Sequence, residues 1–180
     1  DAIYRKRTEG HNTLTINNDS GFNQQQAFVP MIMHEIGSGS SYFVYDMSAS
    51  YKNRGADSVL RGFYAACAQG ELTIRDELVL NQTSEVWWFM HTRANITIED
   101  ERIKLVQDGK IIYLTWETDA ESIEVSSMPA APLDSSPNPE NQNPNSGVTK
   151  VAIKLCGCGT INLDVKFSCT GQPPLNIPIS

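Results

Sequence analysis

Cysteine, basic residues and long apolar runs are all scarce in this 180-residue chain, and each scarcity excludes a class of protein. Four cysteines are too few for a disulfide framework, so the fold must rest on a hydrophobic core, and the compartment stays open. No stretch approaches the roughly 20 apolar residues that cross a bilayer, so we expect no membrane partner. The chain starts at Asp1 without a charged leader, and we expect it to begin within a longer protein.

Basic side chains are outnumbered: 14 Lys and Arg stand against 21 Asp and Glu, for a net charge of −7. A negative surface repels nucleic acid, so no nucleic-acid partner is expected. It also repels acidic glycans unless a local basic patch overrides the long-range field. Arg5, Lys6 and Arg7 form the one dense basic run in the sequence.

A sustained 3.6-residue apolar stripe is absent as well, whereas alternation with period two recurs. It is clearest over residues 71–80, where Asp76 interrupts it, and over 161–167. Asp108-Gly109 lies between two apolar runs within 103–116 and predicts a hairpin. Further strands are expected at 12–16, 42–47, 59–66, 86–91, 96–99, 122–126 and 149–155. We therefore predict an all-β, two-layer antiparallel β-sandwich of the jelly-roll or supersandwich kind, with very little helix, over residues 1–180.

Residues 128–147 contain five prolines, several Asn and Ser, and no apolar period. Proline cannot donate to a sheet ladder, which predicts a surface insert or flexible loop. A domain boundary is the alternative, although the 30 or so residues that follow are too few for an independent core.

The titratable residues form no familiar catalytic or metal-binding motif. His11, His34 and His91 could join a carboxylate such as Asp46 around a metal, but their spacing matches no local ligand motif and favours structural hydrogen bonding. His91 is expected at the rim of its strand. The acidic runs 76–77 and 99–101 could hold a glycosidase pair, although neighbouring acids usually form solvated faces.

Cys156-Gly157-Cys158-Gly159 has the form of half a zinc knuckle with no second half downstream. We interpret it as the tip of a hairpin between strands 149–155 and 161–167. Cys169 then lies about 30 Å from Cys158, at roughly 3.3 Å per strand residue, which predicts free thiols. Cys67 is expected to be a small buried hydrophobe.

Trp87 and Trp88 are neighbours on a predicted strand, so one of them should face the core and the other the opposite side. An outward Trp could stack on a sugar ring, and Trp116 could do the same. Packing against a neighbouring domain is the alternative.

An ordered series of residues resembles the heparinase II/III-like family of polysaccharide lyases. It begins with residues 4–16, which contain Tyr4, a basic run, and His11-Asn12-Thr13 before an apolar strand. It continues with residues 42–48, Tyr51, Arg61, Phe63, residues 76–78 and residues 88–92. The similarity covers Tyr4 to about Trp116.

The resemblance implies that this chain is the C-terminal β-sandwich of a larger lyase that cleaves uronic-acid-containing polysaccharide by β-elimination. The family's catalytic Asn, His and Tyr precede this segment, so no catalytic residue is assigned here. The implied partners are an upstream α/α toroid of the same chain and, through the parent, an acidic polysaccharide. Tyr4 and Arg5 are expected to contact substrate. His11 is expected to be one ligand of a zinc in the parent, with no cofactor held by this part alone.

The leading hypothesis is thus a non-catalytic domain that braces the substrate cleft of a lyase, in a bacterial, periplasmic or secreted setting. An autonomous carbohydrate-binding module is the first alternative, and it requires glycan binding by this chain alone. A purely structural or interaction domain is the second, and it requires none.

Overall fold

The computed structural model describes residues 2–18, 27–175 and 177–180, and it confirms the all-β sandwich. The helices in the described part are single 3₁₀ turns, and none is long and apolar enough to cross a membrane. The elements, in chain order, are η1 Tyr4–Lys6, η2 Thr8–Gly10, β1 Leu14–Ile16, β2 Met31–Ile36, β3 Ser40–Asp46, η3 Ser48–Ser50, β4 Ala56–Ala66, η4 Cys67–Gln69, β5 Glu71–Thr92, β6 Asn95–Glu99, β7 Arg102–Gln107, β8 Lys110–Thr118, β9 Ser122–Pro129 and β10 Thr149–Ser168.

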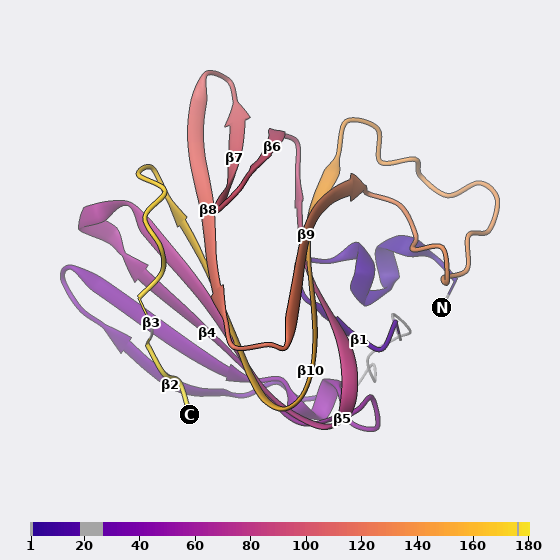
Figure 1. The fold of residues 1–180 in the computed structure, drawn as a ribbon, viewed down its shortest axis with the longest axis horizontal. Helices are drawn as coiled ribbons and strands as arrows, with labels where there is room; N and C mark the ends of the chain where they lie inside the picture. Colours follow the sequence, from indigo (N-terminus) through magenta and orange to yellow (C-terminus); the bar gives the residue numbers. More distant parts are fainter. Residues whose placement is uncertain (1, 19–26, 176) are drawn as a thin grey trace.

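Two long strands, β5 and β10, organise the sandwich. They pair antiparallel along almost their whole length, and both bend at the lower end of the view in Figure 1. Residues 149–157 of β10 and the β5 residues paired with them belong to one layer, and residues 159–167 with their β5 partners belong to the other. One layer has the order β2-β3-β4-β5-β10-β8-β7-β6, and the other consists of β1, β5, β10 and β9. We call these the large sheet and the small sheet.

The bend corrects our expectation of a hairpin at the cysteines. Residues 149–157 and 159–167 both pair with β5, so β10 is one continuous strand and Cys156 and Cys158 lie at its bend. The register shifts between Gly157 and Gly159, and Gly159 has φ +74°. The glycines are compatible with either structure, because a bent strand and a tight turn both use residues that tolerate positive φ. The strands predicted at 71–80 and 86–91 are likewise the two halves of β5.

Some of the other local predictions are confirmed and others are wrong. The hairpin at Asp108-Gly109 is confirmed, with φ of 51° and 73° at the two turn residues. Strand β2 was missed. All four cysteines are free thiols, as expected, but Cys67 is exposed rather than buried, because β4 ends at Ala66 and Cys67 begins the turn η4.

The apolar core lies between the two sheets. It includes Trp88, Leu78, Ile153 and Leu163, which come from both halves of β5 and β10. Additional segments cover the outer faces. The turns η1 and η2 lie over the outer face of the small sheet, together with residues 130–148, which connect β9 to β10. The C-terminal segment crosses the outer face of the large sheet, where Ile179 packs on Gly62.

The bend gives a direct test of its backbone geometry. A Cβ at Gly159 would meet no atom within 4 Å, so the substitution Gly159→Ala isolates the cost of a left-handed backbone. We expect a loss of about 1–2 kcal/mol in the free energy of unfolding, measured by urea denaturation. Gly39→Ala, which is also in open space but without a positive φ, is the matched control. Equal stabilities of the two variants would contradict this account of the bend.

Candidate functional site

The residues that carry the family resemblance, though scattered in sequence, come together around the segment 11–16. Tyr51 donates its hydroxyl hydrogen to the carbonyl oxygen of Leu14 at 2.8 Å, and its oxygen lies 3.1 Å from the hydroxyl of Thr13. Arg61 donates from Nη1 to the carbonyl oxygen of Asn12 at 3.0 Å. Strand β1 adds Leu14–Ile16 to the edge of the small sheet beside β5. The segment is therefore fixed by side chains from β4, from the turn after η3 and from β5.

A buried ion pair supports this anchor. Arg61 donates from Nε and Nη2 to the two carboxylate oxygens of Asp76, at 2.6 and 2.8 Å. Asp76 is fully buried, and Arg61 is only 5% exposed. Burial works to lower the pKa of Arg61, but the Asp76 carboxylate outweighs it and holds that pKa above its ordinary value. The residue that interrupts the apolar alternation of 71–80 is thus the buried partner of Arg61.

A second set of polar contacts links Tyr4 to the same segment. The Tyr4 hydroxyl donates to Nε2 of His91 at 2.7 Å. On the other side of the ring, Asn12 accepts at Oδ1 from the backbone nitrogen of His91 at 2.8 Å and from Nδ1 at 3.1 Å. Burial, together with the positive charges of Lys150 and His11, lowers the pKa of His91 to about 4. The imidazole is therefore neutral at physiological pH, and both ring nitrogens are engaged.

Lys150 is the buried cation at the centre of this cluster. Its ammonium donates to the Tyr4 hydroxyl and to the carbonyl oxygens of Glu9 and Ala131, at 3.2–3.4 Å. It also lies over the ring of Phe89, 4.4 Å from the centroid. Burial lowers the pKa of Lys150 to about 8, although the Glu9 charge opposes that shift. Burial also raises the pKa of Tyr4, so its phenol stays protonated.

The two expected substrate contacts, Tyr4 and Arg5, are neighbours in different environments. The Tyr4 side chain is buried in the cluster, whereas Arg5 is exposed and donates from Nε to Asn145 at 2.8 Å. The basic run does not act as one patch, because Arg7 is 7% exposed and pairs with the buried Glu9. Glu9 in turn accepts from the backbone nitrogen of Leu133 and holds the 130–148 segment.

His11, the expected metal ligand, is exposed and close enough to the His91 imidazole to lower its pKa. Within the described residues, no three His, Cys, Asp or Glu side chains gather as a closed metal site requires. A closed zinc site that includes His11 would need ligands beyond these described residues. Of the histidines, His91 is a hydrogen-bonded group near the end of its strand, as the sequence predicts.

The remaining candidates have structural partners. Asp76 and Glu77 are buried and paired with arginines, so the expectation of a solvated face is wrong for them, whereas Asp100 and Glu101 are exposed. All three tryptophans belong to the described residues, and none is fully exposed. Trp88 lies in the core, as expected for one of the pair. The Trp87 ring stacks on Phe89 at 5.6 Å, and Lys154 covers it at 5.2 Å.

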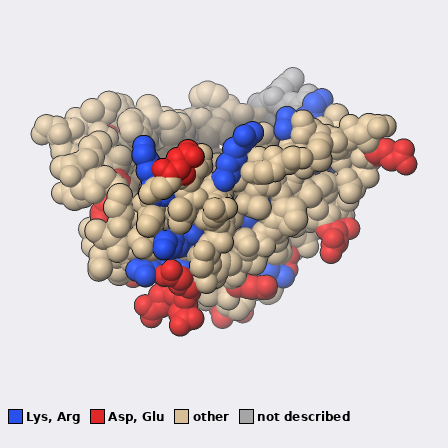
Figure 2. Space-filling model, turned by 90° about the horizontal axis from the view of Figure 1, so that it is seen from above, with Lys and Arg blue, Asp and Glu red and all other residues tan. Residues whose placement is uncertain are grey.

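The charged side chains on one face of the molecule are spread out, in agreement with a basic run that does not act as one patch. Figure 2 shows a mostly uncharged face on which Lys and Arg side chains are scattered, with acidic side chains between them. That face carries no broad basic surface of the kind that attracts a polyanion by long-range steering. Contacts to an acidic glycan would have to be local.

Comparison with known proteins places the fold. Neither a protein-family model nor a curated protein sequence matches the chain. Among solved structures, it is similar to a heparinase III with methylated lysines, at 15% identity and a TM-score of 0.62, over 89% of this chain and 24% of that one. It is also similar to the heparan sulfate lyase HepC from Pedobacter heparinus, at 11% identity and a TM-score of 0.65, over 94% of this chain and 26% of that one. A mutant of that lyase gives 12% identity, a TM-score of 0.66 and coverages of 90% and 24%. The chain spans about a quarter of the length of these structures and shares the fold of that part.

The buried pair allows a test of what anchors the segment 11–16. Arg61→Met leaves Asp76 buried and unpaired, so we expect a loss of about 3–5 kcal/mol in the free energy of unfolding. The double variant Arg61→Met, Asp76→Leu should regain more than half of that loss, because no unpaired charge remains. Arg102→Met, which breaks a much more exposed pair with Glu99 and a contact with the Tyr113 ring, is the control and should cost far less. A single variant as stable as the control would show that the pair anchors nothing.

The cluster around His91 predicts a pH dependence. The pKa of His91 lies at about 4 in the folded protein and near 6.5 when unfolded, so the unfolded state binds more protons between these values. The contribution of His91 to folding stability should therefore fall as the pH drops from about 6.5 to 4. The difference between the unsubstituted chain and His91→Gln isolates this contribution from the opposite one of Asp164, whose pKa is raised to about 6. Urea titrations across this range, with NMR detection of the imidazole, measure both effects. His91→Gln should flatten the slope, whereas His34→Gln, at an exposed position of β2, should leave it unchanged.

Proposed function

We propose that this chain is a non-catalytic accessory domain of a heparinase II/III-like polysaccharide lyase, where it braces the substrate cleft. The observation that carries the proposal is the fold: about nine-tenths of the chain superposes on one quarter of two lyases. The reaction proposed for the parent is β-elimination of a uronic-acid-containing polysaccharide. The rest of such a polypeptide, an α/α toroid, would supply the base and the tyrosine.

The state of Tyr4 and His91 supports the absence of catalysis in this part. Proton abstraction next to a uronate needs a base and an anion-stabilising group that can both reach the sugar in a cleft without bulk water. The Tyr4 hydroxyl is buried and its hydrogen is donated to His91. The His91 ring has partners on both nitrogens. Both residues therefore hold the N-terminal turns in place.

We assign the sugar contact to Arg5 and a holding role to Tyr4. Tyr4 is the last buried residue before the exposed pair Arg5 and Lys6, so anchoring its ring fixes where the two cations project. A guanidinium binds a carboxylate or sulfate with directed hydrogen bonds, which suits a local contact on a protein of net negative charge. Asn145 accepts from Arg5 Nε and limits its freedom.

An exposed edge strand supports a protein neighbour. All six residues of β2 are exposed, and Met31, Ile32, Met33 and Ile36 among them are apolar. An apolar edge strand of this kind is an aggregation hazard unless another surface covers it. The further part of a lyase polypeptide is the neighbour that the proposal provides.

His11 is proposed as one ligand of a zinc whose other ligands lie outside this chain. The His11 imidazole is exposed, whereas that of His91 is partly buried. Elemental analysis of the purified chain should find no stoichiometric zinc, since one imidazole is far short of a tetrahedral site. Zinc that is retained here and lost in His11→Ala would instead reveal a complete local site.

An autonomous carbohydrate-binding module is the second candidate. Its candidate platforms are both partly covered, Trp87 by Phe89 and Lys154 and Trp116 by the core. A purely structural or interaction domain is the third candidate, and the apolar edge of β2 favours it. Heparan sulfate binding by the chain alone separates the second candidate from the other two.

The function is tested by comparing the chain with a longer polypeptide that carries it. The chain alone should form no unsaturated uronate from heparin, heparan sulfate or alginate, whereas the longer polypeptide should cleave at least one of them. In the longer form, Arg5→Ala should raise KM several-fold with little change in kcat, because Arg5 binds substrate and does no chemistry. Lys110→Ala, an exposed cation near the tip of the β7–β8 hairpin, is the control. Cleavage by the chain alone, or unchanged kinetics in Arg5→Ala, contradicts the proposal.

A further inference from the structure

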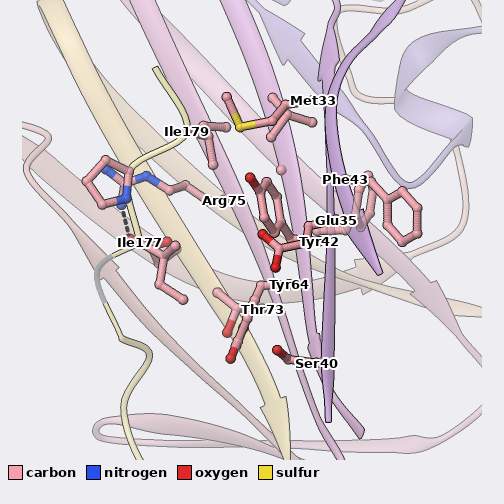
Figure 3. Close-up of a pocket in the computed structure, with 15 residues that line it drawn as sticks. Met33, Glu35, Ser40, Tyr42, Phe43, Tyr64, Thr73, Arg75, Ile177 and Ile179 are labelled. Carbon is pink, nitrogen blue, oxygen red and sulfur yellow. Dashed lines mark hydrogen bonds and ion pairs between the residues drawn. The ribbon is translucent and has the colours of Figure 1, made fainter. Parts of the chain in front are cut away.

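A cavity of about 360 Å³ lies on the outer face of the large sheet, away from the N-terminal turns. Figure 3 shows side chains from neighbouring strands around it, with Ile177 and Ile179 of the C-terminal segment on its other side. Its volume falls within the range of about 300–1,000 Å³ that is typical of small-molecule sites. Its walls combine aromatic and aliphatic side chains with a few charged groups.

The strand register builds this cavity from two rows of residues. Tyr42, Tyr64 and Thr73 are paired across β3, β4 and β5 and form one row. In the next row Gly62 stands beside Arg75, and Arg75 pairs with Asp164 of β10. Gly62 has no side chain, and this leaves a hollow that Ile179 fills in part, with an atom 2.8 Å from the place of a Cβ. Two tyrosine rings therefore stand beside a recess lined by charged groups.

A buried acceptor without a partner lies at the base of this arrangement. Arg75 donates from Nε to Glu77 at 2.7 Å and from Nη1 to Oδ2 of Asp164 at 2.5 Å. The other oxygen, Oδ1 of Asp164, is buried within a side chain that is 6% exposed, and it accepts no hydrogen bond from the described residues. Burial raises the pKa of Asp164 to about 6, against the opposing charge of Arg75. A buried, unsatisfied acceptor is costly, so a donor that reaches this oxygen would be favoured.

The charges around the cavity select among ligands. Among the described lining residues Glu35 and Asp164 are acidic and Arg75 is the one basic side chain. Glu77, which accepts from Arg75, adds a third carboxylate, and Lys166, which pairs with Thr73 in the strand register, adds a second cation. A carboxylate or sulfate on the ligand would meet net repulsion. A hydroxyl or ammonium group would instead satisfy the free oxygen, and tyrosine rings suit the apolar face of a pyranose.

We propose that this cavity binds a sugar ring that carries no negative charge, a neutral hexose or an amino sugar, with one hydroxyl or amino group donating to Oδ1 of Asp164. Tyr42 and Tyr64 contact the face of the ring. The site is a second glycan contact that differs in charge preference from the acidic polysaccharide assigned to the N-terminal turns. It does not depend on the lyase proposal, because it rests on the opposite sheet and on different residues.

The test is an amide NMR titration of the 180-residue chain with methyl glucoside, glucosamine and glucuronate. We expect glucosamine, methyl glucoside or both to shift amide signals of β3, β4 and β10 around the cavity, and glucuronate to shift none. Asp164→Asn keeps the shape but replaces the free acceptor, and it should weaken binding at least about tenfold, as for the loss of a hydrogen bond to a charged group. Asp108→Asn, the same change at the exposed β7–β8 turn, should have no effect.

A second variant keeps the result decisive if Asp164→Asn disturbs the fold. Tyr64→Leu retains an apolar side chain but removes the ring, and it should also weaken binding while the amide spectrum remains folded. Three results would overturn the site: no shifts with any of the sugars, glucuronate binding as strong as the others, or unchanged affinity in folded Asp164→Asn. Each leaves the lyase proposal standing, since that proposal is tested by cleavage and by Arg5.

Discussion

The antiparallel ladder between β5 and β10 is the constraint on which the remaining structure depends. Residues 149–157 pair with one half of β5 and residues 159–167 with the other, so the same two strands run through both sheets. The single break at Gly157–Gly159 sets where the layers diverge. The half with residues 149–157 supports Tyr4, His91 and Lys150, and the half with residues 159–167 supports the cavity beside Asp164. The two proposed glycan contacts are thus held on opposite layers of one continuous ladder.

The buried charged side chains in these two sheets have specific partners. An unpaired buried charge costs several kcal/mol, so each such group here is matched to a specific neighbour. Asp76 is matched to Arg61, and this pair also fixes the backbone of Asn12. Lys150 is matched to oxygens of the N-terminal turns and of the 130–148 segment. Asp164 is the exception among the described residues, since one of its oxygens has no partner. Asp164 lines a cavity, whereas Asp76 and Lys150 lie where the N-terminal segments and the 130–148 segment are anchored.

The resemblance to polysaccharide lyases has a structural explanation in these contacts. Tyr51, Arg61 and His91 are far apart along the chain, yet each donates a hydrogen bond to the segment that contains Asn12 and Thr13, or to Leu14 beside it. Together these contacts anchor the backbone of that segment. The chain covers about a quarter of the matched lyases and shares the fold of that part.

The amino-acid pattern alone was sufficient for the all-β sandwich, the Asp108-Gly109 hairpin and the core position of one of the adjacent tryptophans, because alternation and turn chemistry are local properties. It did not distinguish the bend at Gly157–Gly159 from a hairpin tip, since both need the same tolerant residues. Nor could it show that Arg7 is buried beside Glu9 or that Asp76 is paired in the core, because a charge reveals its partner only when distant strands meet. The cavity beside Asp164 depends on the tertiary structure in the same way: strand register brings Tyr42, Tyr64 and Arg75 to one face, and register is a relation between strands.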